Sequence, residues 1–420
     1  NSIAPENLVA LCHSLKEGNI KDKLKELTTI RGALTMKSVL PIDTVLSTGI
    51  VPVLVEGVKC VSTKVQLECV WILSNLATGN EEQTREVMYS GIAPILLSQL
   101  QSTNDKVYIP MVIGCLGNFC SEEKCRNYLL TNRVIETVLV LFNKYYLNQD
   151  IMENCVFLFK NAFTSLSCSS PSRLRELKTI LQIMAKVIAA YPKQIDLHTG
   201  ILGDMIQFAL SVIENNDLQI GMLVMPIITR ILSILTEAVV ASREGRFDAA
   251  SNYPTKSILE NIGNICAEND AYIMQMIDQG LLSFLNLIYT DPNNDDVLGK
   301  LEVLFCWMNI SGGKCSQALF DTGLLQPIVA NIVALSPQAS DVQFEAARRS
   351  MVILCNFICE CNDNTRLYLL QQNVRALLEG YLEMIRGRWK DEDSSFVIDI
   401  LNRMNRSEER RVGKECRSRW

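Results

Sequence analysis

Six asparagines recur at wide and regular intervals, each late in an apolar stretch of helical periodicity. These ladder asparagines are Asn75, Asn118, Asn161, Asn264, Asn309 and Asn356. The first three lie 43 residues apart, and the last three lie 45 and 47 residues apart. A side-chain amide offers hydrogen-bond donors and an acceptor, and a core does not need one in every structural unit. We therefore expect the row to hold the main chain of an extended peptide, rather than to be six unrelated surface amides.

An aromatic residue precedes some of these asparagines by four positions. Trp71 precedes Asn75, and residues i and i+4 share one face of a helix. An aromatic ring beside an amide can cover the stem of a lysine and attract its ammonium group. Phe157 and Phe305 hold the same place before later ladder asparagines. A core position is the alternative for all three rings.

The elements that would position this row are helices in units of three. Apolar residues recur at helical spacing along almost the whole chain, and strand-like alternation is scarce. Pro94 suits the first turn of the helix that follows Gly91. Between the first two helices of each unit stands a Gly or Asn, a type that tolerates the left-handed conformation. These junctions are Gly49, Gly91, Asn132, Gly280, Gly323 and Asn373. A period of 41–50 residues is typical of armadillo or HEAT repeat arrays.

The charge of the chain favours basic partners. The formal net charge is −6 over 420 residues. Residues 406–420 (RSEERRVGKECRSRW) are identified as a translated sequencing adapter, which we expect to be non-native, so residues 1–405 would form the repeat array with a net charge of −9. A general nucleic-acid binder would need a basic stripe instead. Because the chain starts at Asn1 without a Met, we also expect native residues to be missing before it.

The residue types needed for catalysis or metal binding do not come together in the sequence. We find no phosphate-binding loop, nucleophile elbow or carboxylate pair, and His13 and His198 lie far apart. We therefore expect no enzyme activity, no cofactor and no metal. Most cysteines stand singly in apolar runs, which fits reduced thiols in the cytosol or nucleus. The most apolar segment, Leu218–Ala241, is interrupted by Pro226, Arg230 and Glu237, so buried helices are favoured over a membrane span.

Two segments resemble importin alpha, the armadillo adaptor that carries basic nuclear localisation signals into the nucleus. Gln66–Leu100 reads QLECVWILSNLATGNEEQTREVMYSGIAPILLSQL, and Pro41–Leu54 reads PIDTVLSTGIVPVL. The likeness continues around Asn264 and Asn309 and covers roughly residues 20–380 in register. It implies an all-α fold, a right-handed armadillo superhelical solenoid of about eight to nine repeats.

The resemblance also implies two peptide sites. The major site would consist of Trp71, Asn75, Gly79, Thr84, Asn118, Glu122, Asn154, Phe157 and Asn161. The minor site would consist of Asn264, Glu302, Phe305, Asn309 and Asn356. Glu122 stands where the family has an Asp that pairs with the key lysine of the ligand.

The chain departs from the family pattern mainly in its aromatic residues. Gly114 and Val352 stand at positions where the family has aromatic side chains. Glu260 stands at a family Arg, and Arg349 at a family Glu. We therefore expect a divergent member whose cargo range is narrowed or altered.

The predicted function is that of a nuclear import adaptor that shuttles between cytoplasm and nucleus. Its expected partners are basic nuclear localisation signals, importin beta and an export receptor, without direct binding to nucleic acid or membrane. The family's basic segment that binds importin beta would be absent from this chain, and the last repeat, starting near Asp391, would be incomplete. The alternatives are an armadillo scaffold for other protein partners, favoured by the lost aromatics and by Arg348 and Arg349, and a regulatory subunit built on HEAT-like repeats.

Overall fold

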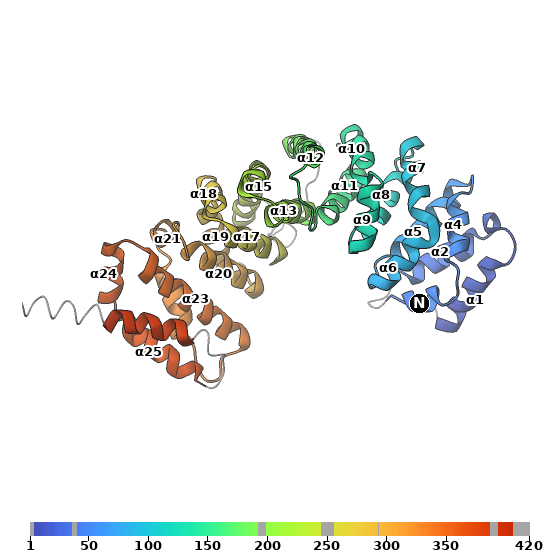
Figure 1. Cartoon of the computed structure of the whole chain (residues 1–420). Helices are drawn as coiled ribbons and strands as arrows, with labels where there is room; N and C mark the ends of the chain where they lie inside the picture. The colour runs from blue at the N-terminus through green and yellow to red at the C-terminus, as the bar shows by residue number, and fades with distance from the viewer. Residues whose placement is uncertain are drawn as a thin grey trace, which may run out of the picture. The chain divides into compact units, whose positions relative to one another are not determined.

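The computed structural model consists of helices and the loops that join them (Figure 1). It describes residues 4–35, 40–191, 199–244, 256–292, 294–386 and 394–405, and this part contains no strand. The predicted all-α fold is confirmed. The expected non-native tail 406–420, His198 and the expected start of the last repeat at Asp391 lie outside the described residues.

The chain divides into two compact units, Asn1–Ile227 and Ile228–Trp420, with the boundary inside α15. The helices before α15 are α1 (Pro5–Lys16), η1 (Ile20–Asp22), α2 (Leu24–Ala33), α3 (Ile42–Leu46), α4 (Val51–Val58), α5 (Thr63–Leu76), α6 (Glu81–Val87), the π turn η2 (Met88–Ile92), α7 (Ala93–Ser102), α8 (Tyr108–Phe119), α9 (Glu123–Thr131), α10 (Val134–Tyr145), α11 (Gln149–Ala162), α12 (Pro171–Ala190), α13 (Thr199–Glu214) and α14 (Leu218–Gly221). From there on the chain forms α15 (Met225–Arg243), α17 (Lys256–Glu268), α18 (Asp270–Asp278), α19 (Leu281–Thr290), α20 (Val297–Ser311), α21 (Ser316–Phe320), α22 (Leu325–Val333), α23 (Asp341–Glu360), α24 (Asp363–Gln371) and α25 (Val374–Ile385), and residues 394–405 are helical as well.

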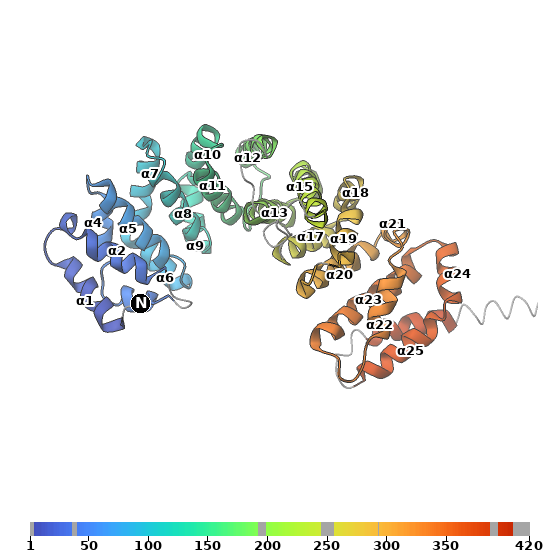
Figure 2. The ribbon, with the colours of Figure 1, turned by 180° about the vertical axis from the view of Figure 1, so that it is seen from behind.

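Each predicted three-helix unit ends in a long helix that packs on the long helices of its neighbours. In the first compact unit α5 packs between α2 and α8, and α8 packs on α11. In the second compact unit α20 packs between α17 and α23. Figures 1 and 2 show these helices following one another in chain order within each unit. Within each unit their apolar faces form a continuous core, because one set of three helices alone could not bury them.

The junctions between first and second helices use the left-handed conformation, as the sequence predicted, with one exception. Gly91, Gly280 and Gly323 have φ values of 94°, 95° and 85°. The prediction is wrong by one residue at Asn132, because Arg133 takes the positive φ of 61° there. The Asn132 side-chain nitrogen instead donates to the Tyr128 carbonyl at 2.8 Å and closes the end of α9.

Side-chain caps start many of the short helices. Asn80 forms a reciprocal capping box with Gln83 at the start of α6, and Ser340 forms one with Gln343 at the start of α23. Such bonds satisfy backbone N–H groups that have no partner inside the helix. The Asn80 cap therefore fixes where the chain restarts after the ladder helix α5, and the Ser340 cap fixes where the ladder helix α23 begins.

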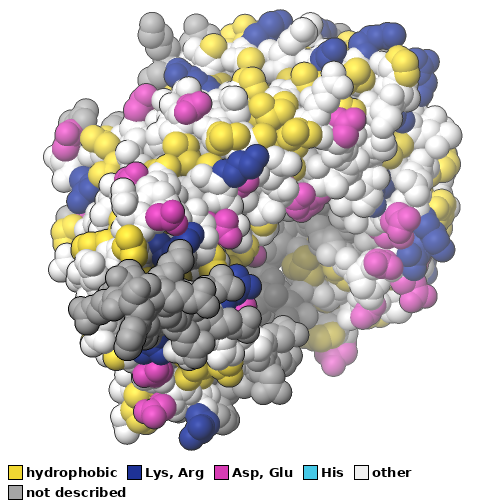
Figure 3. All heavy atoms as spheres, turned by 60° about the vertical axis from the view of Figure 1, so that its left-hand side comes forward, with side chains coloured by type: hydrophobic (Ala, Val, Ile, Leu, Met, Phe, Trp, Pro, Cys, Tyr) yellow, Lys and Arg dark blue, Asp and Glu magenta, His cyan; other side chains and the backbone are white. Residues whose placement is uncertain are grey.

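Among the described residues one helix, α15, is long and apolar enough to cross a membrane by length and composition alone, but 50% of its most apolar window is buried in the protein. That burial is what a core helix of a repeat array requires. On the face that Figure 3 brings forward, basic and acidic side chains are interspersed with apolar ones.

The cysteines of the described part are free thiols, and all but Cys359 are buried. Burial raises the pKa of Cys69 and of Cys120 to about 12, so both thiols stay protonated at neutral pH. Within the described ranges, no three His, Cys, Asp or Glu side chains are grouped so that they could hold a metal ion.

Candidate functional site

Within each compact unit, three ladder asparagines lie on successive long helices. Asn75, Asn118 and Asn161 lie on α5, α8 and α11, and Asn264, Asn309 and Asn356 lie on α17, α20 and α23. All six side chains are half-buried. None is lost to the core, and each is held at the surface where long helices meet.

Hydrogen bonds between neighbouring long helices join the ladder in the first compact unit. The Asn118 side-chain nitrogen donates to the Ser74 carbonyl and the Ser74 hydroxyl, both at 3.0 Å. The Asn161 side-chain nitrogen donates to the Gly117 carbonyl at 2.9 Å. Ser74 and Gly117 each directly precede the previous ladder asparagine, so the bonds place successive amides next to each other.

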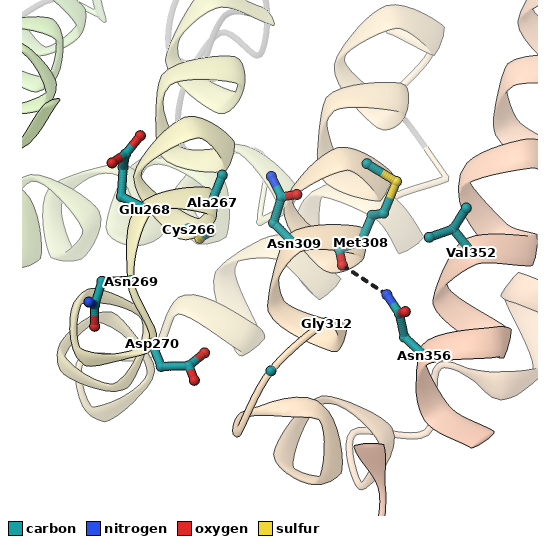
Figure 4. Close-up of a pocket in the computed structure, with 11 residues that line it drawn as sticks. Cys266, Ala267, Glu268, Asn269, Asp270, Met308, Asn309, Gly312, Val352 and Asn356 are labelled. Carbon is teal, nitrogen blue, oxygen red and sulfur yellow. Dashed lines mark hydrogen bonds between the residues drawn. The ribbon is translucent and has the colours of Figure 1, made fainter. Parts of the chain in front are cut away.

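The second compact unit repeats this arrangement. The Asn309 side-chain nitrogen donates to the Gly263 carbonyl at 2.9 Å, and Gly263 directly precedes Asn264. Asn356 donates to the Met308 carbonyl at 3.4 Å and to the Ser311 hydroxyl at 3.0 Å (Figure 4). The amide nitrogens therefore link repeats, while their side-chain oxygens are not used in these bonds.

Asn75 differs from these four. Its side-chain nitrogen is buried and has no hydrogen-bond partner. Leaving such a donor unpaired costs about 1–3 kcal/mol. A hydrogen-bond acceptor added beside the Asn75 nitrogen would therefore gain more binding free energy than one added beside an amide that is already bonded.

The three aromatic rings are half-buried, and each carries a cation of the chain itself. The Arg31 guanidinium carbon lies 4.2 Å from the centroid of Trp71. Lys160 Nζ lies 5.0 Å from the centroid of Phe157. The Arg349 guanidinium carbon lies 5.5 Å from the centroid of Phe305. The sequence predicted that these rings could attract a cation, but not that the chain supplies one.

Glycines beside the ladder make room for the two Phe rings. A Cβ built on Gly117 would lie 2.7 Å from the ring of Phe157, and one on Gly263 would clash with the ring of Phe305. Gly114 stands at a predicted aromatic position, and a Cβ there would lie 2.6 Å from Asn154 Oδ1. The Asn154 amide thus fills the space beside Gly114 that a larger side chain would need.

Glu122 is buried at the start of α9, where it is already neutralised. Its carboxylate accepts from the Cys125 N–H at 2.8 Å and from Arg85 at 2.8 Å. Burial acts to raise the pKa of Glu122, but the bonds from Cys125 and Arg85 prevail and hold it at about 2. The carboxylate therefore serves as a helix cap and as an ion-pair partner in the absence of a ligand.

Three other predicted site residues also have partners inside the chain. Glu302 is buried with Arg349 at 3.6 Å, and burial raises the pKa of its carboxyl above the ordinary value. The buried Thr84 hydroxyl bonds the Ala77 and Asn80 carbonyls at 3.1 and 2.9 Å. Gly79 lies against the side chain of Gln83.

A cavity of about 500 Å³ lies beside the ladder in the second compact unit (Figure 4). It is lined by Cys266, Ala267, Glu268, Asn269, Asp270, Met308, Asn309, Gly312, Gly313, Val352 and Asn356. Two ladder amides and two carboxylates share this cavity, which suits a ligand with amide groups and positive charge. Sequence reasoning missed Glu268 and Asp270. Their position four and six residues after Asn264, around the cap of α18, is the signal that could have found them.

Comparison with known proteins shows what the chain is similar to. The Armadillo/beta-catenin-like repeat family matches residues 38–78. A probable importin subunit alpha-A of Dictyostelium discoideum is 34% identical over 140 residues, or 33% of this chain and 25% of that protein. Importin subunit alpha-1a of Oryza sativa subsp. japonica is 24% identical over 333 residues, or 77% of this chain and 58% of that protein. The chain thus spans between a quarter and somewhat over half of these relatives.

A solved structure of an engineered protein shares the fold. It superposes with a TM-score of 0.61 over 95% of this chain and 99% of that chain, at 13% identity. Because the identity is only 13%, this similarity supports the fold and nothing further. The chain is thus similar to importin alpha subunits in sequence, matches an armadillo repeat over residues 38–78, and has the helical fold of a repeat solenoid.

Proposed function

We propose that this chain is a nuclear import adaptor that binds Lys/Arg-rich segments of cargo proteins, in extended form, along its ladder asparagines. The observation that carries the proposal is the row of half-buried amides on successive long helices. Neighbouring helices pack about 8–10 Å apart, and an extended chain advances about 3.3 Å per residue. One amide would therefore meet the ligand main chain about every three residues.

The proposed major site lies on α5, α8 and α11, and the proposed minor site lies on α17, α20 and α23. The minor site would include Glu268 and Asp270 in addition to the predicted residues, because their carboxylates line the same cavity as Asn309 and Asn356. Importin beta and an export receptor as partners, and shuttling between cytoplasm and nucleus, belong to the same proposal. They are extended from relatives that are named as importin subunits.

The test is a titration of the full chain with a fluorescent Lys/Arg-rich peptide at low salt. We expect saturable binding that weakens as salt screens the charges, and no binding of a Glu-rich peptide of the same length. Asn75→Ala should weaken binding about three- to tenfold, the loss of one hydrogen bond. Asn127→Ala, an exposed amide on α9 outside the ladder, is the matched control and should bind like the wild type. Absence of saturable binding at high micromolar peptide would refute the proposal.

A second candidate is a scaffold that binds less basic partners. It is favoured by the cations already placed over Trp71, Phe157 and Phe305 and by the neutralised Glu122. In the same titration, a neutral extended peptide that binds more tightly than the Lys/Arg-rich one would select the scaffold.

A further inference from the structure

We propose that Arg31 occupies the Trp71 ring in place of a ligand cation and thereby sets the residue selectivity of this position. The inference rests on the proposed function, since it concerns the same groove. Its consequence is that a basic ligand side chain gains nothing from Trp71 unless Arg31 leaves, so this position favours a non-basic ligand residue.

Arg31 is held over the ring from a neighbouring helix. It lies on α2, which packs on the Trp71 helix α5, and its guanidinium carbon is 4.2 Å from the ring centroid. Its Nε donates to the Glu68 carboxylate at 2.7 Å. The two side chains are only 22% and 14% exposed, so solvent screens their pairing less than that of a fully exposed ion pair. The contact with the Trp71 ring and the ion pair with Glu68 therefore both hold the Arg31 side chain in place.

The other two rings show the same combination of a cation over the ring and an acid that holds the cation. Lys160 lies over Phe157 and pairs with Asp204 of α13 at 2.7 Å. Arg349 lies over Phe305, and its Nε donates to Glu345 at 2.7 Å. The cations come from the preceding repeat, from the same helix and from the following repeat respectively. Three different origins for one arrangement indicate that a covered ring is a recurring property of this row.

The effect of Arg31 on ligand affinity depends on what is gained and lost when a ligand cation replaces Arg31 on the Trp71 ring. A ligand lysine that stacks on Trp71 restores the ring contact that Arg31 loses, so the attraction between ring and cation nearly cancels. The exchange also separates Arg31 from Glu68, and the bond between two charged groups is among the stronger hydrogen bonds. The net contribution of the ring to a basic ligand is therefore small while Arg31 stays, and it becomes favourable once Arg31 is removed.

The experiment removes the pair without changing the net charge. The double variant Arg31→Gln/Glu68→Gln is titrated with the Lys/Arg-rich peptide and should bind about three- to tenfold more tightly than the wild type. The gain should vanish when Trp71→Ala is added to both proteins, because an exposed ring is then no longer present. Lys59→Gln/Glu56→Gln removes an exposed ion pair of 2.7 Å on α4 and its end. This matched control should leave the affinity unchanged.

The outcomes separate the two proposals. Wild-type binding without a gain in the double variant, or a gain that persists with Trp71→Ala, overturns the role of Arg31 and leaves the adaptor proposal standing. No binding by any of these proteins overturns the adaptor proposal and, with it, the proposed role of Arg31.

A second measurement does not depend on the folding of variants. The δ-methylene protons of Arg31 should show a ring-current shift in the NMR spectrum of the free wild-type chain. Saturating Lys/Arg-rich peptide should leave that shift in place, because a basic ligand side chain gains nothing by displacing Arg31. A free protein without the shift contradicts the position of Arg31 over the ring, and a shift that the peptide abolishes overturns its effect on selectivity.

Discussion

Most of the ladder asparagines combine a hydrogen bond inside the protein with a side chain that stays partly exposed. Four of them donate a hydrogen bond to the preceding repeat, and all six remain half-buried. A side chain that is fixed by one internal bond loses less freedom when a ligand binds. The bonds that join the repeats would therefore also prepare these amides for the extended peptide that we propose as the ligand.

The internal bonds can be measured by comparing two members of the ladder. Asn161→Ala should lower the free energy of unfolding by about 1–2 kcal/mol, because the buried Gly117 carbonyl loses the Asn161 donor. Asn75→Ala is the matched variant and should cost less, since the Asn75 side-chain nitrogen has no partner to lose. Urea unfolding followed by circular dichroism checks both. Equal losses would mean that the bond to Gly117 adds nothing to stability.

At the scale of elements, the junction residues determine where one helix stops and the next begins. Gly323 has a φ of 85° before α22, whereas Gly380 lies inside α25 with ordinary helical geometry. Neither position has a heavy atom within 4 Å of an added Cβ. Substitution at either site therefore reports on the backbone alone.

Alanine at these two glycines should have opposite effects. Gly323→Ala should destabilise the chain by about 1 kcal/mol, because a left-handed conformation is unfavourable for a residue with a Cβ. Gly380→Ala should stabilise it by about 0.5–1 kcal/mol, because alanine loses less freedom in a helix. Thermal unfolding of the two variants gives the comparison, and a shift of the same sign in both would contradict the backbone explanation.

At the scale of the molecule, the chain is an array in which the described helices contact their near neighbours in sequence. Stability in such arrays is approximately a sum of local terms, and local opening follows the same units. The division into two compact units places the two halves of the ladder in separate bodies. A defect in one half should therefore stay there.

Hydrogen exchange can test this independence. Asn161→Ala should speed exchange in α8 and α11, which it joins, and leave the protection of α20 and α23 unchanged. Asn309→Ala should do the reverse, because its bond joins α17 and α20. Mass spectrometry of deuterium uptake by peptide segment provides the measurement. Faster exchange across both units from either variant would show that the array unfolds as a single body.

The sequence alone predicted the features that depend on local pattern. Helical periodicity predicted the all-α fold, and the spacing of Gly and Asn predicted most junctions. The internal partners could not be predicted, because they come from the neighbouring repeat: Gly117 lies 44 residues before Asn161, and Arg31 reaches Trp71 from another helix. Glu122 shows the same limit, since its position indicated a free groove charge while Arg85 of α6 neutralises it.

The bond that four of the ladder amides donate to the repeat before them has a consequence for how the row is interpreted. An asparagine that joins two repeats serves the fold with or without a peptide ligand, whereas a ring at the surface does not. The row of asparagines is therefore first a feature of the architecture, and binding of a basic peptide has to be judged from the rings and from the cations that cover them.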